Sequence, residues 1–268
     1  YLFEEAIYIV QDRYPNVCFL LLDGEPHDAA FTDFKTATNV HCILYKEEQA
    51  GFLAGYAAVK EGFTKLGFLG GIALPSVVRY GYGFIQGAEA AAVDEGLADG
   101  SVQINYWYSG DFKATDEVKT KMAAWYSAGT EVIFACGGPV YLSAVAAANE
   151  AQGKKVIGVD VDQAAESELI ITSAMKELTL SVKEALTSFY QTNHAWDTNR
   201  GGKTLTLGAN ENGVGLPTKA SSWRFTTFTV EQYTELFNAI KDGALTISDN
   251  TTVVPQTTKV VADFQNQA

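Results

Sequence analysis

The chain has 268 residues, of which 47% are hydrophobic, and this is enough for two lobes of ordinary domain size with a substantial core. Its formal net charge of −13 would repel a phosphate backbone, which argues against non-specific binding to nucleic acids. The three cysteines, Cys18, Cys42 and Cys136, lie in apolar runs without C-x-x-C spacing. We therefore expect small buried side chains there, and neither a disulfide scaffold nor a metal site.

The first 64 residues are expected to form two helices and two strands. Residues 1–13 place apolar side chains on one helical face, and Tyr14-Pro15-Asn16 ends this helix. The continuous apolar run 17–22 is typical of a parallel strand buried on both faces, and residues 39–45 form the next strand. The helix expected over 47–62 is rich in glycine and alanine, which indicates close packing against a neighbouring element.

From residue 65 onward, strands and helices alternate, which predicts an α/β fold with a parallel sheet. The expected strands are 65–71, 102–108, 131–136 and 155–160, with a further apolar run at 169–171. The expected helices are 77–96, 116–128, 140–152 and 179–191. After residue 192 the pattern loosens into a strand at 203–207, an amphipathic helix at 229–241 and a β-like tail at 251–265.

Two strands before residue 65 are too few for a parallel sheet. The region after residue 171 could complete that sheet, or β-α units upstream of Tyr1 could be missing from this sequence. We expect that both are the case. We assign residues 1–64 to lobe one, 65–171 to lobe two, and 172–230 to a return into lobe one with crossing segments. Residues 231–268 form a C-terminal helix and tail whose lobe the pattern leaves open.

Common catalytic and cofactor motifs are absent from the sequence. No G-x-G-x-x-G follows a strand, and there is no phosphate-binding G-x-x-x-x-G-K-[ST] loop. The three histidines, His27, His41 and His194, are scattered, and neither H-E-x-x-H nor G-x-S-x-G occurs. We therefore expect no metal, no cofactor and no hydrolase nucleophile.

Polar or aromatic residues instead follow the ends of several expected strands: Asp23, Asp111 with Phe112, Gly137 with Gly138, Asp160 with Asp162, and Lys176. Taken singly, these residues have ordinary structural interpretations, such as a turn former at Asp23, a core side chain at Phe112 and a surface lysine at Lys176. Taken together, they predict a cleft that grips a polar small molecule, because ligands of open parallel sheets bind beyond the carboxyl ends of the strands.

A series of stretches in order also carries a family resemblance. They are Tyr14-Pro15-Asn16-Val17, Leu22-Asp23, residues 45–55 (YKEEQAGFLAG), 65–71 (KLGFLGG), 79–87 (RYGYGFIQG), Ser109-Gly110-Asp111-Phe112, Gly137-Gly138, 157–163 (IGVDVDQ), 172–176 (TSAMK) and 213–216 (GVGL). In these residues the chain resembles the basic membrane protein family of ABC-transporter substrate-binding lipoproteins, which includes purine nucleoside receptors. The resemblance covers most of residues 1–217.

The resemblance implies a type I periplasmic-binding-protein fold, with two doubly wound parallel-sheet lobes joined by a hinge and a ligand between them. The implied ligand is a nucleoside such as inosine, guanosine or adenosine. By the family's pattern, Asp23 and Asp160 would bind the ribose hydroxyls with Lys176 beside them, Phe112 would lie against the base, and Gly137 would allow close approach of the backbone.

The resemblance also implies a monomer that delivers its ligand to an ABC permease. It implies a lipid anchor on the outer face of the cytoplasmic membrane, with the signal and anchor outside this sequence. The family's first β-α units, with an Asp/Asn-Ser-Phe-Asn segment that lines the pocket, precede the position of Tyr1. Cys136 and Pro139 replace the smaller residues usual around the double glycine, which leaves the ligand's identity open.

Two other functions remain possible from the residues. The chain could be the effector-binding domain of a regulator with the same fold, although no helix-turn-helix occurs in this sequence. It could also be a nucleoside-processing enzyme, because two strand-end acids permit one, but no nucleophile–base pair supports catalysis. We expect a binding protein and not an enzyme.

Overall fold

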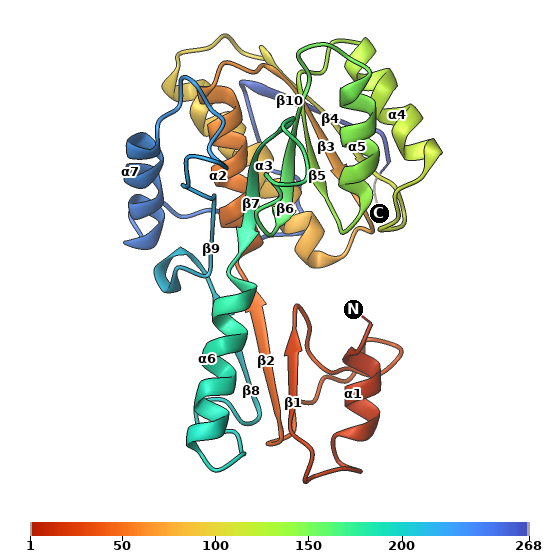
Figure 1. Ribbon diagram of the computed structural model, residues 1–268, viewed down its shortest axis with the longest axis vertical. Helices are drawn as coiled ribbons and strands as arrows, with labels where there is room; N and C mark the ends of the chain where they lie inside the picture. The colour runs from red at the N-terminus through yellow and green to blue at the C-terminus, as the bar shows by residue number, and fades with distance from the viewer. Residues whose placement is uncertain (1, 267–268) are drawn as a thin grey trace. The chain divides into compact units, whose positions relative to one another are not determined.

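The computed structural model describes residues 2–266, and the chain divides into two compact units. The first unit comprises Tyr1–Tyr45 and Glu177–Gly213, and the second comprises Lys46–Lys176 and Val214–Ala268. Each unit is built on its own predominantly parallel sheet, as the alternation of strands and helices predicted (Figure 1).

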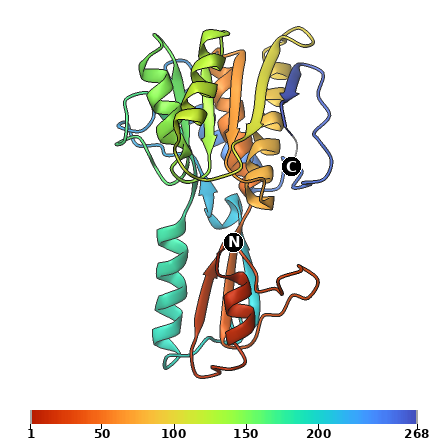
Figure 2. The same cartoon turned by 90° about the vertical axis from the view of Figure 1, so that its right-hand side faces the viewer.

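The sheet of the first unit has three parallel strands in the order β1-β2-β8, namely Phe19–Leu22, Val40–Tyr45 and Lys203–Leu207. The prediction that a segment beyond residue 171 joins this sheet is confirmed by β8, which pairs with β2 from His41↔Lys203 onward. Helices α1 (Glu4–Val10) and α6 (Leu178–Gln191) flank the strands (Figure 2).

Alternation along β2 explains why the two helices lie on different faces of this sheet. Val40 and Cys42 form a small core with Ile7 of α1, whereas the Tyr45 hydroxyl lies 2.5 Å from Ser181 Oγ of α6. Residues an odd number of positions apart in a strand point to opposite faces. The helices α1 and α6 therefore cover opposite faces of β2.

The second unit contains a seven-stranded sheet in the order β10-β4-β3-β5-β6-β7-β9. In that order the strands are Val260–Phe264, Val102–Tyr108, Lys65–Gly70, Val132–Cys136, Lys155–Asp160, Ile170–Lys176 and Val214–Gly215. All neighbouring strands are parallel except β9, which is antiparallel to β7. The expected β-like tail supplies the edge strand β10.

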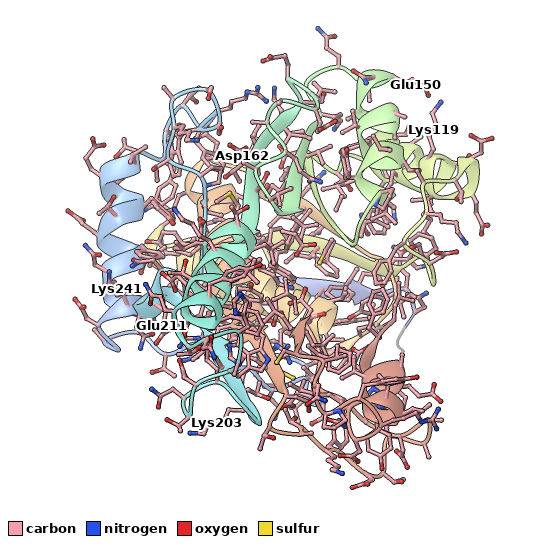
Figure 3. The ribbon with its side chains drawn as sticks, turned by 60° about the horizontal axis from the view of Figure 1, so that its bottom comes forward. Lys119, Glu150, Asp162, Lys203, Glu211 and Lys241 are labelled. Carbon is pink, nitrogen blue, oxygen red and sulfur yellow. The ribbon has the colours of Figure 1, made fainter. Side chains whose placement is uncertain are left out.

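Helices cover both faces of this sheet. Helices α4 (Asp116–Ser127) and α5 (Val140–Asn149) pack on the face that carries Leu69, Ile133 and Ala135, and Lys119 of α4 pairs with Glu150 at 2.6 Å (Figure 3). Helix α3 (Pro75–Asp94) packs on the other face, where Phe84 contacts Phe134. The remaining helices of the unit are α2 (Glu47–Lys60) and α7 (Val230–Lys241).

Helices α2 and α3 contact each other through their backbones. A Cβ atom at Gly51 or Gly55 of α2 would clash with a carbonyl oxygen of α3, and one at Gly83 or Gly87 would clash with a carbonyl oxygen of α2. All four hypothetical atoms fall well inside 3.0 Å, a separation that real Cβ atoms essentially never show. The close packing expected from the small residues of 47–62 is therefore present, and it fixes which side chains of the two helices meet.

The two units group three segments differently from the lobes assigned from sequence. Residues 46–64, assigned to the first lobe, form α2 and group with the second unit because α2 packs along α3. Residues 172–176 and 214–230 also group with the second unit, since β7 runs on to Lys176 and β9 pairs with it. The C-terminal segment 231–268 belongs there as well, because β10 pairs with β4.

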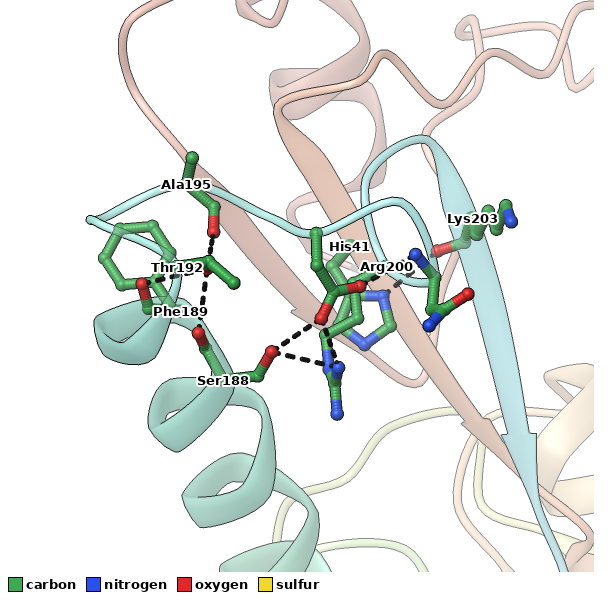
Figure 4. A network of polar contacts seen from close by, with 9 residues as sticks. His41, Ser188, Phe189, Thr192, Ala195, Arg200 and Lys203 are labelled. Atoms are coloured by element: carbon green, nitrogen blue, oxygen red, sulfur yellow. Dashed lines mark hydrogen bonds and ion pairs between the residues drawn. The ribbon is translucent and has the colours of Figure 1, made fainter.

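The loop between α6 and β8 is held by side-chain hydrogen bonds in place of regular structure (Figure 4). The Asp197 carboxylate accepts hydrogen bonds from Ser188 Oγ at 2.7 Å, from Arg200 Nη1 at 2.6 Å and from the Asn199 N–H at 2.7 Å. These bonds connect the last turns of α6 to the start of β8. Over the described part of the chain, no helix is both long enough and apolar enough to cross a membrane.

Candidate functional site

Five neighbouring strands of the second unit end at one edge of the sheet. Gly70 at the end of β3 pairs with Tyr108 of β4 and with Cys136 of β5, and Asp160 at the end of β6 pairs with Met175 of β7. Residues just beyond these positions therefore collect at the same edge. Four of the five predicted site residues follow or end these strands: Phe112, Gly137, Asp160 and Lys176.

Asp160 is the last residue of β6 and has a left-handed backbone conformation, with φ of 64°. Its Oδ1 atom accepts a hydrogen bond from the Tyr80 hydroxyl at 3.3 Å and lies 3.6 Å from Lys176 Nζ. The side chain remains 38% exposed. Within the described residues, both of these contacts fall on Oδ1, so Oδ2 is left to interact with a bound molecule.

Lys176 is the last residue of β7, and its side chain is only 3% exposed. A buried ammonium group is costly unless it is paired. Nζ lies 3.1 Å from Glu47 Oε1 and 5.5 Å from the centre of the Tyr80 ring. The interpretation of Lys176 as an ordinary surface lysine is therefore wrong, because burial and a carboxylate partner hold it under the site.

Glu47 comes from the first turn of α2, and Arg79 from the first half of α3 donates to its Oε2 at 2.6 Å. Together with Tyr80, these residues surround Lys176 and Asp160, and sequence reasoning did not single them out. The available signal was the pair Glu47-Glu48 at the start of a helix that is rich in small and apolar residues. An acid that is buried in its charged form needs a nearby cation.

Phe112 lies in the loop after β4, with its ring against two glycines. A Cβ at Gly137 would come within 2.7 Å of Phe112 Cδ1, and a Cβ at Gly71 would come closer still. Gly137 also has φ of 143°, where a side chain would be strained. Close approach at Gly137 was expected, and the group that approaches it in this structure is the ring of Phe112.

Cys136, the residue before Gly137, is fully buried, and burial raises the pKa of its thiol.

Asp162, considered with Asp160 as a second acid of the site, has a structural role. Its Oδ2 accepts a hydrogen bond from Ser222 Oγ at 2.5 Å, and its Oδ1 accepts one from the Ala164 N–H at 3.1 Å. The bond to Ser222 ties the loop after β6 to the segment before α7. The two carboxylates therefore differ: Asp162 stabilises a turn, whereas Asp160 keeps one oxygen without a contact to any other residue that the structure describes.

Asp23 belongs to the first unit and follows β1 directly. Its backbone is left-handed, with φ of 60°, and its N–H donates to Ile43 O at 2.9 Å. The next residue, Gly24, is buried against Glu4 of α1, where a Cβ would not fit. Asp23 thus ends its strand with the same backbone conformation as Asp160, which turns each side chain out of its strand.

Similarity to proteins with known structures concerns the fold. A crystal structure of an ABC transporter solute-binding protein from Aeropyrum pernix matches 92% of this chain and 69% of its own, with a TM-score of 0.67 and 20% identity. A transcriptional activator of the comK gene from Bacillus halodurans matches 96% of this chain and 78% of its own, with a TM-score of 0.66 and 18% identity. The predicted periplasmic-binding-protein-like α/β fold is confirmed, and this fold occurs in both receptors and regulators.

Sequence similarity to curated proteins is found with basic membrane proteins and a nucleoside-binding protein. Basic membrane protein B of Borreliella burgdorferi is 30% identical over 220 residues, which cover 81% of this chain and 60% of that protein. The ABC transporter nucleoside-binding protein BmpA of Lactococcus lactis subsp. cremoris is 27% identical over 199 residues, which cover 68% and 52%. The chain thus spans between half and two thirds of the length of these relatives.

A family model described as "ABC transporter substrate-binding protein PnrA-like" matches residues 1–250. The resemblance seen in the motifs is therefore confirmed over nearly the whole chain. The description of this family refers to substrate binding for ABC transporters. The chain belongs to the Bmp family of PnrA-like ABC transporter substrate-binding proteins.

Proposed function

We propose that the protein binds a nucleoside and delivers it to an ABC importer. The observation that carries this proposal is the Asp160 carboxylate, which ends a strand. Its Oδ1 faces the buried Lys176, and its Oδ2 has no contact within residues 2–266. A carboxylate accepts hydrogen bonds from both neighbouring hydroxyls of a ribose. Such charge-assisted bonds contribute about 1.5–3 kcal/mol each.

The aromatic part of the ligand is assigned to Phe112. A nucleobase stacked on an aromatic ring gains roughly 1–3 kcal/mol. Gly137 supports this role because its missing side chain leaves room for the Phe112 ring beside the backbone. The proposal further assigns a ribose contact to Asp23 of the first unit, whose strand-end backbone matches that of Asp160.

The nucleoside is also supported by a relative, since the Lactococcus lactis protein is named as an ABC transporter nucleoside-binding protein. Near Asp160, Lys176 lies between the carboxylates of Asp160 and Glu47, and Arg79 pairs with Glu47. We place the protein outside the cytoplasmic membrane with a lipid anchor, acting as a monomer with a membrane permease as its partner.

Isothermal titration calorimetry of the full-length protein with inosine, guanosine and adenosine tests this function. Asp160→Ala is expected to weaken binding by about 10-fold or more, which corresponds to roughly 1.4 kcal/mol. Asp162→Ala is the matched control, because this acid lies two residues away and its carboxylate bonds to its own loop and to Ser222. The proposal is wrong if no nucleoside binds, or if both variants retain the affinity of the wild type.

A further inference from the structure

Four charged side chains of the second unit form a chain that leads from the α2–α3 contact to the strand-end edge of the sheet. Arg79 Nε donates to Glu47 Oε2 at 2.6 Å, Glu47 Oε1 lies 3.1 Å from Lys176 Nζ, and Lys176 Nζ lies 3.6 Å from Asp160 Oδ1. The charges alternate along it. We call Arg79, Glu47, Lys176 and Asp160 the ion-pair chain.

Lys176 lies between two carboxylates that hold it unequally. Glu47 is closer, at 3.1 Å against 3.6 Å, and its side chain is 1% exposed, whereas that of Asp160 is 38% exposed. The attraction between two charges grows as they approach and as water is excluded from around them. Of these two carboxylates, Glu47 therefore attracts Lys176 more strongly than Asp160 does.

This inequality matters for the ligand, and the inference therefore depends on the function proposed above. If Lys176 formed a close ion pair with Asp160, the carboxylate would be occupied, and its oxygens would accept ligand hydroxyls less well. We propose that Glu47 is a positioning residue that draws Lys176 away from Asp160 and so leaves the Asp160 carboxylate available to the ligand. Glu47 acts through Lys176 and need not touch the ligand.

The Tyr80 hydroxyl supports this arrangement from α3. It donates to Asp160 Oδ1 at 3.3 Å, the same oxygen that faces Lys176, while the ring lies beside the ammonium group. Among the described residues, both contacts to this carboxylate fall on Oδ1, so Oδ2 keeps its capacity to accept hydrogen bonds.

Glu48 provides a matched comparison. It is adjacent to Glu47 and is also buried, but it is not part of the ion-pair chain. Its Oε2 has no hydrogen-bond partner within the part of the chain that the structure describes, and it lies 4.0 Å from Arg79 Nε. Replacing Glu48 with glutamine therefore removes a buried acid from the same helical turn and leaves Lys176 with its partner.

The first test measures nucleoside affinity by calorimetry for wild type, Glu47→Gln and Glu48→Gln. We expect Glu47→Gln to bind about 10-fold more weakly, which corresponds to roughly 1.4 kcal/mol, and Glu48→Gln to bind as wild type does. In a Lys176→Met background, adding Glu47→Gln should change the affinity by less than about 2-fold, because interacting residues lose additivity. Full additivity of the two substitutions would overturn the inference.

The second test needs no ligand, so it separates this inference from the proposed function. In a crystal structure of the Glu47→Gln variant, Lys176 Nζ should move from 3.6 Å to about 2.8 Å from an Asp160 oxygen, the usual length of a charged hydrogen bond. An unchanged Lys176 would overturn the inference even if nucleosides bind. Failure of the wild type to bind nucleosides, with the shift observed, would reject only the proposed ligand.

If Glu47→Gln does not fold, Arg79→Gln provides a milder perturbation. Arg79 is partly exposed, and it bonds to Oε2 of Glu47, which is not the oxygen that faces Lys176. With its restraint removed, Glu47 should hold Lys176 less firmly, and affinity should fall by less than the loss expected for Glu47→Gln. An Arg79→Gln variant with wild-type affinity and an unmoved Lys176 would contradict the proposal.

Discussion

The contact between α2 and α3 determines whether the ion-pair chain can form, and replacing Gly83 with alanine tests this dependence. A Cβ at Gly83 would fall about 1 Å inside the 3.0 Å limit to the backbone carbonyl oxygen of Glu48. Because that oxygen belongs to a helix backbone, it cannot rotate away. The two helices must separate. Glu47 belongs to α2, so it would move away from Arg79 of α3.

The expected loss of stability follows from two opposing effects. Overpacking a tight contact costs typically 1–3 kcal/mol, and alanine in place of glycine within a helix recovers roughly 0.5–1 kcal/mol. We therefore expect Gly83→Ala to destabilise the second unit by about 1–2 kcal/mol. Separation by about 1 Å would also stretch the 2.6 Å bond between Arg79 and Glu47, so ligand affinity should fall too.

Urea denaturation followed by tryptophan fluorescence measures the stability, and calorimetry measures the affinity. Val93→Ala on the same helix is the control, because Val93 is 54% exposed and its loss should change stability by less than about 0.5 kcal/mol. A Gly83→Ala variant at least as stable as wild type would refute the reasoning, because it would show that α2 and α3 can separate without cost.

Two further predictions concern pH. Desolvation raises the pKa of Glu48 to about 7. The folded protein therefore holds the proton of this carboxyl group more tightly than the unfolded chain does. The free energy of unfolding should fall by about 3 kcal/mol as pH rises from 4.5 to beyond 7. Glu48→Gln should remove that decline in urea titrations, and an unchanged pH profile would contradict the assignment. Hydrogen bonds from Ser188, with help from Arg200, lower the pKa of Asp197 to about 2. The charged carboxylate therefore stabilises the first unit above pH 4, and this stabilisation is lost as pH falls toward 2. Asp197→Asn should lower the free energy of unfolding by about 1–2 kcal/mol at pH 7, after allowance for solvent screening, and by progressively less below pH 4. An equal loss at pH 7 and below pH 4 would argue against a role for the charge of Asp197.

Local periodicity accounts for how well the elements could be predicted. Runs of apolar residues fall on the buried strands β3 and β5. The turn residues between such runs indicated where each strand ends and the next helix begins. Assignment to units was less successful, because it depends on which surfaces pack together. Helix α2 groups with the second unit through glycine contacts to α3, and β10 groups with it by pairing with β4.

The site shows the same contrast. The sequence by itself determined that Phe112, Gly137, Asp160 and Lys176 lie at one edge of a parallel sheet, because the carboxyl ends of parallel strands share that edge. Only the tertiary structure decided what holds these side chains. Glu47 and Tyr80 reach Lys176 from two helices whose backbones touch, and Ser222 engages Asp162 from a segment about 60 residues away in the chain. Contacts between distant segments depend on packing, which a local pattern of residue types does not encode.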